Sequence, residues 1–517
     1  MERSLGELAR RRAEDRAQQT AFVSGENSMS YHDLDRLSDE LAAQLESHGL
    51  SAGDRVGYLG RNRLMYPVVA VAASKVGAIS VGVNWRLAAH ELAAVIQDCS
   101  PHTLYTDDEF LATAQAALQL TQTADLPALA TIDADPAHTL ARLAEANGAP
   151  PEAAHNMFVD RAARLDDLAS LTYTSGTTGL PKGVMTSNGA LIEHLDVEMD
   201  WTLDDTAVAM IVSPVFHAVG SVWTAMTIHG GATGVLVPDP DPVAILDAIE
   251  QQRVTHTLFV PALLQILLDH PDRPGRDLSA LKVLVYGASP ISEKLLERTK
   301  EILPWVDLVQ GYGMTETTGP VTFLRPSEHI SGSPLLRTAG RAAPNCEIRV
   351  FDLSTSAPAE PGMPGEVMTR STQLCDGYWN NEAATEDLFD DDGWLHTGDI
   401  GILDANGYLT LTDRVKDVII SGGENVYSGE VERVLLAIDG VTEACVVGVP
   451  DDKWGETVMA VLVAADPPDL ADVVEFCRER LAHYKCPRHV AFVDTLPKNP
   501  SGKIMRRLVR DQFSDES

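Results

Sequence analysis

Basic residues are scarce in this sequence, which has 40 lysines and arginines against 75 aspartates and glutamates among 517 residues. The formal net charge of −35 disfavours nonspecific binding to nucleic acid and to anionic membranes. It also opposes an anionic ligand, so a phosphate site would have to be locally basic or assisted by a metal ion. We interpret the acidity itself mainly as an adaptation of the surface to solubility, and we expect no nucleic-acid partner.

Cysteine pairs and zinc motifs are also absent. The cysteines form no C-x-x-C pair, no cysteine–histidine cluster has zinc spacing, and there is no H-E-x-x-H motif. The sequence therefore indicates reduced thiols, mostly in the core of a cytoplasmic protein. The six cysteines are Cys99, Cys346, Cys375, Cys445, Cys477 and Cys486.

No hydrophobic run is long enough to suggest a membrane span. The most apolar stretch, 66–85, is interrupted by Lys75 and by glycines, and the N-terminus has no apolar signal core. The Arg10–Arg12 run is compatible with contact to a membrane surface, but a solvated helix face is the favoured interpretation. We therefore expect a cytoplasmic location and no integral membrane segment.

Length and periodicity indicate several folding units. A chain of 517 residues exceeds one compact core. Helical and strand patterns alternate, which predicts an α/β fold with largely parallel sheets covered by helices. The expected helices are 33–50, 66–76 and 242–252, and the expected strands are 55–59, 168–173, 207–212, 256–260, 281–286 and 306–310.

The pattern changes in the last third of the chain. Short strands and turns begin at Gly365, and a new unit begins around Asp413–Asp417. The remainder predicts a small α+β domain. Its expected helices are 428–438 and 469–483, and its expected strands are 443–449, 458–463 and 489–493. We therefore predict an N-terminal domain of several subdomains at 1–413 and a C-terminal domain at 414–517.

The segment Leu171–Gly183 has the composition of a polyphosphate-binding loop. Its glycines allow backbone N–H groups to approach anionic oxygens, its hydroxyl groups add donors, and Lys182 adds a mobile cation. It is not a Walker A loop, because Lys182 follows Pro181 and precedes Gly183. Three further motifs follow expected strands, at 214–217, 287–290 and 311–317. Since ligands collect at the carboxyl ends of parallel strands, these motifs predict one shared site.

Six motifs, in order, resemble the signature motifs of the adenylate-forming (ANL) superfamily. They are 174–183, Gln310–Thr317, Trp394–Asp399, Arg414–Asp417, Ser421–Tyr427 and Pro497–Lys503. The resemblance covers nearly the whole chain and is greatest to fatty-acyl-CoA and related acyl-CoA ligases. It implies an acid–thiol ligase that uses ATP, Mg²⁺ and coenzyme A. It also implies a C-terminal domain that moves as a lid between an adenylation step and a thioester-forming step.

The resemblance also implies roles for individual residues. The loop would hold the β- and γ-phosphates, Glu316 and Thr174 would bind the metal ion, and Thr315 would bond the α-phosphate. Tyr312 would stack on adenine above the 287–289 backbone, while Asp399 and Arg414 would bond the ribose. The implied nucleotide- and CoA-binding residues are Thr174, Ser175, Gly176, Thr177, Thr178, Gly179, Lys182, Gly287, Ala288, Ser289, Gly311, Tyr312, Asp399, Arg414, Lys416, Gly422 and Gly423. The implied catalytic residues are Lys503, Glu316, Thr315 and His217.

In this interpretation each half-reaction depends on one lysine: adenylation on Lys503, and thioester formation on the hinge residue Lys416. Lys503 lies in a Pro/Ser/Gly turn and would bridge the substrate carboxylate and the α-phosphate, stabilising the transition state. Acylation of Lys503 would remove that charge, which makes it a candidate for regulation. Lys416 occupies the hinge position of the family, and Gly422 and Gly423 fall where the pantetheine arm approaches.

The acyl substrate is only partly constrained. Amino-acid adenylation domains usually place an aspartate where this chain has His217, so the resemblance implies a carboxylic acid without an α-amino group. We favour a medium- to long-chain aliphatic acid, with Met314, Val219 and Gly220 lining the pocket. An aryl or steroid-side-chain acid, a carrier-protein acceptor in place of CoA, and a luciferase-like oxygenase remain alternatives.

A non-catalytic nucleotide-binding or scaffolding protein is a further alternative of a different class. The intact residues Lys182, Glu316, Asp399 and Lys503 argue against it. The sequence does not indicate an oligomeric state and leaves a homodimer open.

Overall fold

The computed structural model describes residues 2–122, 126–146, 163–174, 181–197, 199, 201–289, 291–421, 424–451, 453–464, 466–498 and 504–514. The chain divides into two compact units. Unit 1 comprises Met1–Glu347 and Arg370–Leu395, and unit 2 comprises Ile348–Thr369 and His396–Ser517. The sequence predicts a different division, into domains 1–413 and 414–517, with the boundary at the proposed hinge motif. That boundary stays a prediction.

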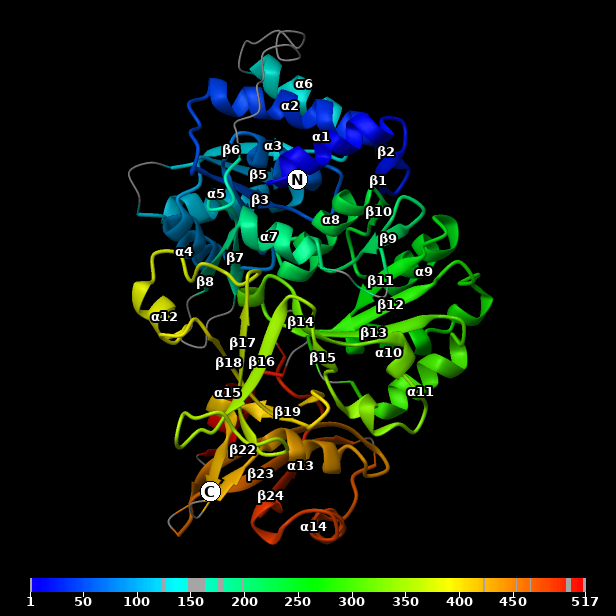
Figure 1. Cartoon of the computed structure of the whole chain (residues 1–517), viewed down its shortest axis with the longest axis vertical. Helices are drawn as coiled ribbons and strands as arrows, with labels where there is room; N and C mark the ends of the chain where they lie inside the picture. Colours follow the sequence, from blue (N-terminus) through cyan, green and yellow to red (C-terminus); the bar gives the residue numbers. More distant parts are fainter. Residues whose placement is uncertain are drawn as a thin grey trace. The chain divides into compact units, whose positions relative to one another are not determined.

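The larger sheet of unit 1 is parallel in its interior and antiparallel at its edges (Figure 1). Among the described residues its strands run in the order β15 (Arg341–Ala342), β14 (Pro320–Leu324), β13 (Asp307–Gly313), β12 (Val283–Gly287), β11 (His256–Phe259), β9 (Val208–Ile211), β10 (Thr233–Leu236), β1 (Thr20–Ser24) and β2 (Asn27–Ser30). Parallel pairing joins β12 to β13, so the two loops that follow the expected strands 281–286 and 306–310 leave from adjacent positions.

The second sheet of unit 1 contains the two strands that flank the predicted phosphate loop in the sequence. Its order in the described residues is β6 (Ala128–Ile132), β5 (Thr103–Asp107), β3 (Arg55–Leu59), β4 (Ile79–Gly82), β7 (Leu168–Thr174) and β8 (Lys182–Ser187). All neighbouring strands from β6 through β5, β3 and β4 to β7 pair in parallel, whereas β7 and β8 pair antiparallel. The predicted strands at 55–59 and 168–173 are therefore confirmed.

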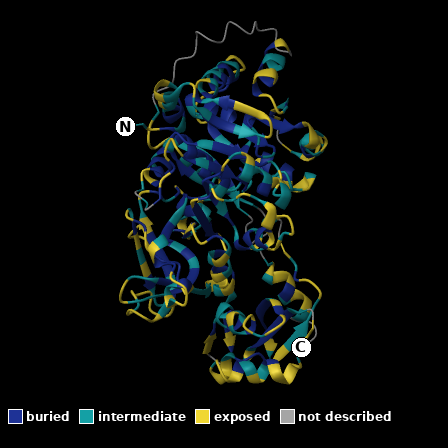
Figure 2. Ribbon diagram, turned by 90° about the vertical axis from the view of Figure 1, so that its right-hand side faces the viewer, coloured by how far each residue is buried: buried dark blue, intermediate teal, exposed yellow. Residues whose placement is uncertain are grey.

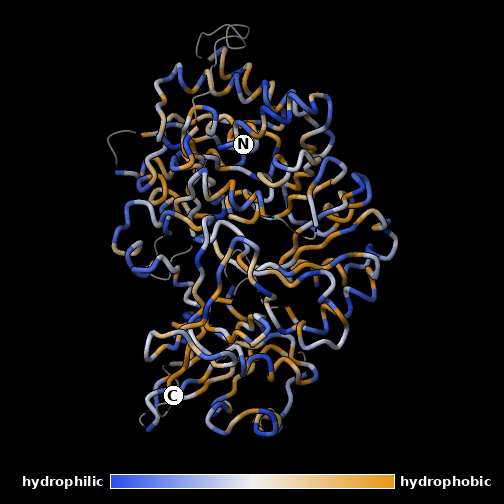
Figure 3. The backbone as a smooth tube through the Cα atoms, in the orientation of Figure 1, coloured by the Kyte–Doolittle hydropathy of each residue, from blue (hydrophilic) through white to orange (hydrophobic). Residues whose placement is uncertain are grey.

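Most of the helices in unit 1 bury one apolar face, whereas α3 (Met65–Lys75) is buried nearly all round. In α2 (Tyr31–Ser47), Leu34, Leu37, Leu41 and Leu45 are buried, and Ser30 and Asp33 form a capping box at the N-terminus. The remaining α-helices of unit 1 are α1 (Leu5–Arg16), α4 (Ala89–Cys99), α5 (Leu111–Leu120), α6 (Pro136–Ala146), α7 (Asn188–Leu195), α8 (Ala218–Gly230), α9 (Pro242–Gln251), α10 (Pro261–Asp269), α11 (Glu293–Ile302) and α12 (Glu382–Glu386). Buried residues are concentrated in the strands and on the inner faces of the helices (Figure 2). This agrees with the hydropathy of the residues along the chain (Figure 3).

Unit 2 contains two smaller sheets in the described residues. One has the order β16 (Cys346–Phe351), β17 (Pro364–Ser371), β18 (Leu395–Leu403) and β19 (Leu409–Arg414), with the ends of β16 to β18 reaching the unit boundaries. The other contains β21 (Glu424–Val426), β20 (Ile419–Ser421), β23 (Gly455–Ala464) and β22 (Val441–Asp451), with β24 (His489–Phe492) beside β23. The α-helices are α13 (Ser428–Leu435), α14 (Leu470–Arg478) and α15 (Arg506–Ser514).

Both faces of the β22–β23 pair are buried. Ala444 and Val446 pack in a cluster that includes residues of α13 and α14, whereas Cys445 and Val447 pack in a cluster that includes Val509 of α15. Alternate side chains of a strand point to opposite faces, so β22 has an unbroken apolar run from Ala444 to Val447. The predicted α+β architecture of this region is confirmed.

Other expectations have clear outcomes. All six cysteines are buried and free, as predicted. No helix among the described residues is long and apolar enough to span a membrane. The predicted helix 469–483 is too long, because α14 ends at Arg478 and a 3-10 turn occupies His483–Lys485.

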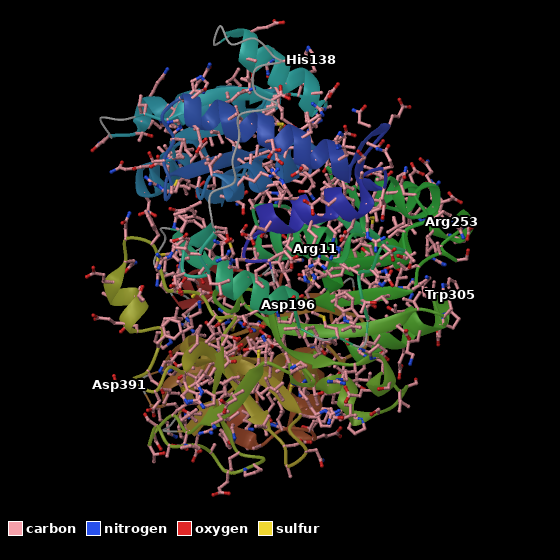
Figure 4. All side chains as sticks on the ribbon, turned by 45° about the horizontal axis from the view of Figure 1, so that its top comes forward. Arg11, His138, Asp196, Arg253, Trp305 and Asp391 are labelled. Atoms are coloured by element: carbon pink, nitrogen blue, oxygen red, sulfur yellow. The ribbon has the colours of Figure 1, made fainter. Side chains whose placement is uncertain are left out.

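His138 and Arg253, which are labelled in Figure 4, are exposed polar residues at the surface of unit 1.

Candidate functional site

Two paired glycines allow strands β12 and β13 to approach closely at the last residue of β12. Gly287 pairs with Gly311, and a Cβ atom on Gly287 would lie 2.3 Å from the Gly311 carbonyl oxygen. The chain then turns at Ala288, whose φ of 63° is in the left-handed region, and reaches the exposed Ser289. The 287–289 backbone, which is predicted to contact adenine, thus lies beside the strand that contains Tyr312.

The predicted Thr315–Thr317 motif is a 3-10 turn held by side chains. The Met314 N–H donates to Thr317 Oγ1 at 2.9 Å. Gln373 Nε2 donates to the carbonyl oxygens of Thr317 at 3.0 Å and of Pro320 at 3.2 Å. These bonds fix the backbone on both sides of Glu316, and Gln373 is a positioning residue that the sequence did not indicate.

Glu316 is a buried carboxylate for which the described residues supply no cationic partner. It is 6% exposed, and Tyr378 Oη donates to its Oε1 at 2.7 Å. Among the described residues no lysine, arginine or histidine forms an ion pair with it. Burial of an unpaired charge is costly, so the position suits a bound cation.

The donor set around Glu316 fits magnesium better than a metal held by several side chains. The described residues contain no group of three or more His, Cys, Asp or Glu side chains that could hold a metal ion. Magnesium commonly takes one or two carboxylates together with waters and substrate phosphates. Burial, followed by the neighbouring Glu316 charge, raises the pKa of Tyr378 well above its usual range, so its hydroxyl remains a donor to the carboxylate.

Thr174 and Lys182 face each other at the end of the β7–β8 hairpin. They are register partners, and Thr174 Oγ1 donates to the Lys182 carbonyl oxygen at 3.5 Å. The Lys182 ammonium lies 4.6 Å from the centre of the Tyr378 ring. The predicted loop residues Ser175, Gly176, Thr177, Thr178 and Gly179 lie outside the described residues.

The segment 375–379 joins the phosphate-loop strand to the Glu316 turn. Gly377 accepts from the Met185 N–H at 2.9 Å, and the Trp379 N–H donates to the Gly183 carbonyl at 2.8 Å. On its other side, the Cys375 N–H donates to the Glu316 carbonyl oxygen at 2.9 Å. Figure 1 shows this segment leading into α12 beside β8. Thr174, Lys182 and Glu316, predicted separately, are therefore brought together in unit 1.

His217 is a half-buried residue at the start of α8, directly after the buried Val215 and Phe216. Burial, assisted by the charge of Arg86, lowers the pKa of His217 to about 4, so the imidazole is neutral at neutral pH. Asn62 Nδ2 donates to the carbonyl oxygens of Ile211 at 3.1 Å and Ser213 at 3.0 Å, and its Oδ1 accepts from the Val215 N–H at 3.0 Å. Asn62 thus fixes the loop before His217, and no sequence signal assigned it that role.

Asp399 and Arg414 form an ion pair within unit 2. They are register partners on β18 and β19, and Arg414 Nε lies 2.9 Å from Asp399 Oδ1. Partial desolvation is the main cause that lowers the pKa of Lys416, an exposed residue of the 3-10 turn Val415–Asp417. The two predicted ribose ligands are therefore adjacent, next to the predicted hinge.

The remaining predicted residues, Gly422, Gly423 and Lys503, lie outside the described residues. The helix that follows Lys503 in the sequence, α15, forms ion pairs with α13 and with the predicted hinge segment. Arg506 Nη2 lies 2.5 Å from Glu432 Oε2, and its Nη1 lies 3.6 Å from Asp417 Oδ2.

Comparisons with known proteins identify the family. The model of the AMP-binding enzyme family matches residues 9–379, and that of the AMP-binding enzyme C-terminal domain matches residues 430–503. A fatty acid–[acyl-carrier-protein] ligase, ScoC, of Streptomyces coeruleorubidus is 36% identical over 95% of this chain and 92% of its own. A feruloyl-CoA synthase of Amycolatopsis sp is 36% identical over 98% of this chain and 99% of its own. The ATP-bound structure of MatB from Rhodopseudomonas palustris has a TM-score of 0.86 and 28% identity over 100% of both chains.

The chain belongs to the AMP-binding enzyme family. It is an ATP-using acid–thiol ligase, and the predicted family, fold class and enzyme class are confirmed.

Proposed function

From this family membership, we propose that the protein is an acyl-CoA synthetase that converts a carboxylic acid to its CoA thioester through an acyl-adenylate. The buried carboxylate of Glu316, which has no ion-pair partner in the described part of the chain, carries the proposal, because Tyr378 donates to it and also contacts the Lys182 ammonium with its ring. A carboxylate acceptor and a phosphate-binding cation on one rigid segment suit the metal-bound triphosphate of ATP.

In the first step, a substrate carboxylate oxygen forms a bond to the α-phosphorus, and the bond to pyrophosphate breaks. Magnesium, when bound, would neutralise phosphate charge. Lys182 would hold the terminal phosphates, and Glu316 and Thr174 would face the metal ion. Thr315 would donate to the α-phosphate. Lys503 would bridge the two reacting anions, which otherwise repel one another.

The adenosine would be held by groups from two regions of the chain. Tyr312 and the 287–289 backbone would contact adenine, and Asp399 and Arg414 would bond the ribose hydroxyls. The ion pair between Asp399 and Arg414 fixes the carboxylate, which can accept two hydroxyl bonds at once.

In the second step, the CoA sulfur forms a bond to the acyl carbonyl carbon, and AMP leaves. We propose that domain 414–517 rotates about Lys416 between the steps and that Gly422 and Gly423 admit the pantetheine arm.

We propose a medium- to long-chain aliphatic acid as the substrate. The neutral His217 at the acyl side supplies no charge for a substrate ammonium, which supports an acid without an amino group. The feruloyl-CoA synthase relative supports an aryl acid as the second candidate, and the ScoC relative supports a carrier-protein thiol as the alternative acceptor.

A panel of carboxylic acids, scored by pyrophosphate release with and without CoA, tests the proposal. We expect pyrophosphate release that depends on the acid, and AMP release that increases with CoA. AMP release with a phosphopantetheinylated carrier protein and not with CoA would identify the alternative acceptor. No pyrophosphate with any acid would contradict the proposed reaction.

A further inference from the structure

We propose that Tyr378 is a positioning residue that holds Glu316 and Lys182 apart, so that the carboxylate stays available to magnesium and the ammonium to phosphate. This inference rests on the proposed function, because it assigns a magnesium–triphosphate ligand to these two groups. It adds a residue to the site that neither the glycine-rich loop nor the Thr-Glu-Thr turn contains.

One tyrosine side chain contacts both charges by different means. Its hydroxyl donates to Glu316 Oε1 at 2.7 Å, and its ring lies 4.6 Å from the Lys182 ammonium. The hydroxyl bond occupies one acceptor position of the carboxylate and leaves the others for a ligand. The ring attracts the ammonium through its π face without neutralising its charge.

Without such a spacer, the two charges would be expected to pair. Opposite charges in a partly buried site attract strongly, and a direct ion pair would remove both from ligand binding. Yet in the described part of the chain no ion pair joins Glu316 to Lys182. The tyrosine provides each with a contact that is weaker than a direct ion pair and that a ligand can supplement.

The backbone gives Tyr378 little freedom to move. Residue 378 forms a β-bridge with Val184, two residues after Lys182. Its own N–H donates to Thr385 Oγ1 at 2.9 Å, which ties it to the last part of α12. The strand of Lys182 and the turn of Glu316 are therefore spaced by hydrogen bonds on both sides of the tyrosine.

Tyr378→Phe tests the hydroxyl, because it keeps the ring against Lys182. We propose to measure ATP binding by calorimetry, with and without Mg²⁺ and without any acid, on the full-length chain. The expected result is about a tenfold weaker affinity for magnesium–ATP, the size of losing a hydrogen bond to a charged group, with metal-free ATP affinity unchanged. Tyr378→Leu removes the ring as well, and we expect it to weaken metal-free ATP binding too.

The matched control is Tyr31→Phe, which removes a different buried tyrosine hydroxyl. Tyr31 Oη donates to the Ala232 carbonyl oxygen at 2.7 Å, so the control loses a hydroxyl bond of the same length, made to a neutral backbone acceptor. We expect unchanged ATP binding there, and thermal unfolding of all variants reports any general loss of structure.

The outcomes separate this inference from the proposed function. If the unaltered protein binds magnesium–ATP and Tyr378→Phe binds it equally well, the role of Tyr378 is wrong while the proposed function stands. Equal weakening with and without Mg²⁺ would likewise reject it, since a merely structural role would affect both. If the unaltered protein binds no ATP at all, the proposed function fails, and this inference fails with it.

Discussion

Replacing Gly287 by alanine should damage both the fold and the nucleotide site. The new Cβ would lie 2.3 Å from the Gly311 carbonyl oxygen, a backbone atom that cannot rotate away. Strands β12 and β13 would have to separate by a substantial fraction of an ångström at their ends. Overpacking of this kind costs about 1–3 kcal/mol, and we expect the upper part of that range because the obstacle is backbone.

Gly275→Ala is the matched control. A Cβ atom on Gly275 would meet nothing within 4 Å, and its backbone is outside the positive-φ region. The control should therefore leave the stability of unit 1 nearly unchanged. A contrasting case is Gly57, where the nearest atom, at 2.8 Å, is the flexible Leu104 Cδ1, so alanine should be tolerated better there than at Gly287.

The assays are thermal unfolding and ATP binding on the same preparations. We expect Gly287→Ala to lower Tm by several degrees, at about 2–4 °C per kcal/mol, and to weaken ATP binding, because the displaced loop is the proposed adenine floor. If Gly287→Ala and Gly275→Ala were indistinguishable in both assays, the close approach of β12 and β13 would not matter as we argue.

Three further predictions concern catalysis and pH. Lys503→Ala should abolish acyl-adenylate formation but spare thioester formation from preformed acyl-adenylate; equal loss of both half-reactions, measured separately, would contradict the assigned role. Lys416→Pro should block the thioester step while pyrophosphate release from acid and ATP stays measurable, and normal overall turnover would reject the hinge. Burial lowers the pKa of four histidines from 6.5 to about 4, so the unfolded chain binds their protons at higher pH than the folded protein; these are His194, His217, His256 and His329. The free energy of unfolding should therefore fall as the pH drops from about 6.5 to about 4, and His217→Gln should reduce the slope by up to about 1.4 kcal/mol per pH unit, as measured by urea unfolding. An unchanged slope would show that His217 is not buried as a neutral group.

Much of the fold could be predicted because apolar periodicity reports local burial. The helix pattern of Leu34, Leu37, Leu41 and Leu45 became the buried face of α2. The end of α14 was missed because the apolar pattern continues past it. There the N–H groups of Arg480 and Leu481 both donate to the Cys477 carbonyl oxygen, and the regular helix ends. The residue types in this segment do not indicate that hydrogen-bond pattern.

The candidate site was predicted only where its residues are adjacent in sequence. Lys182 and Glu316 each lie in a short motif whose composition indicates phosphate or metal chemistry. Tyr378 is 62 residues from Glu316, and Asn62 is 149 residues from Ile211, so their roles arise from tertiary contacts. A tyrosine after a glycine, or an asparagine in a polar loop, has many ordinary explanations in a sequence.

The double-sided burial of β22 and β23 has a consequence for protein engineering. Because α13, α14 and α15 cover both faces, the strand pair satisfies its hydrophobic requirements from its own neighbourhood. Such a segment is suited to exchange between homologous ligases as an intact cassette, with the crossover placed in the turn that precedes β20. Libraries of such hybrids would show which substrate preferences are transferred together with this segment.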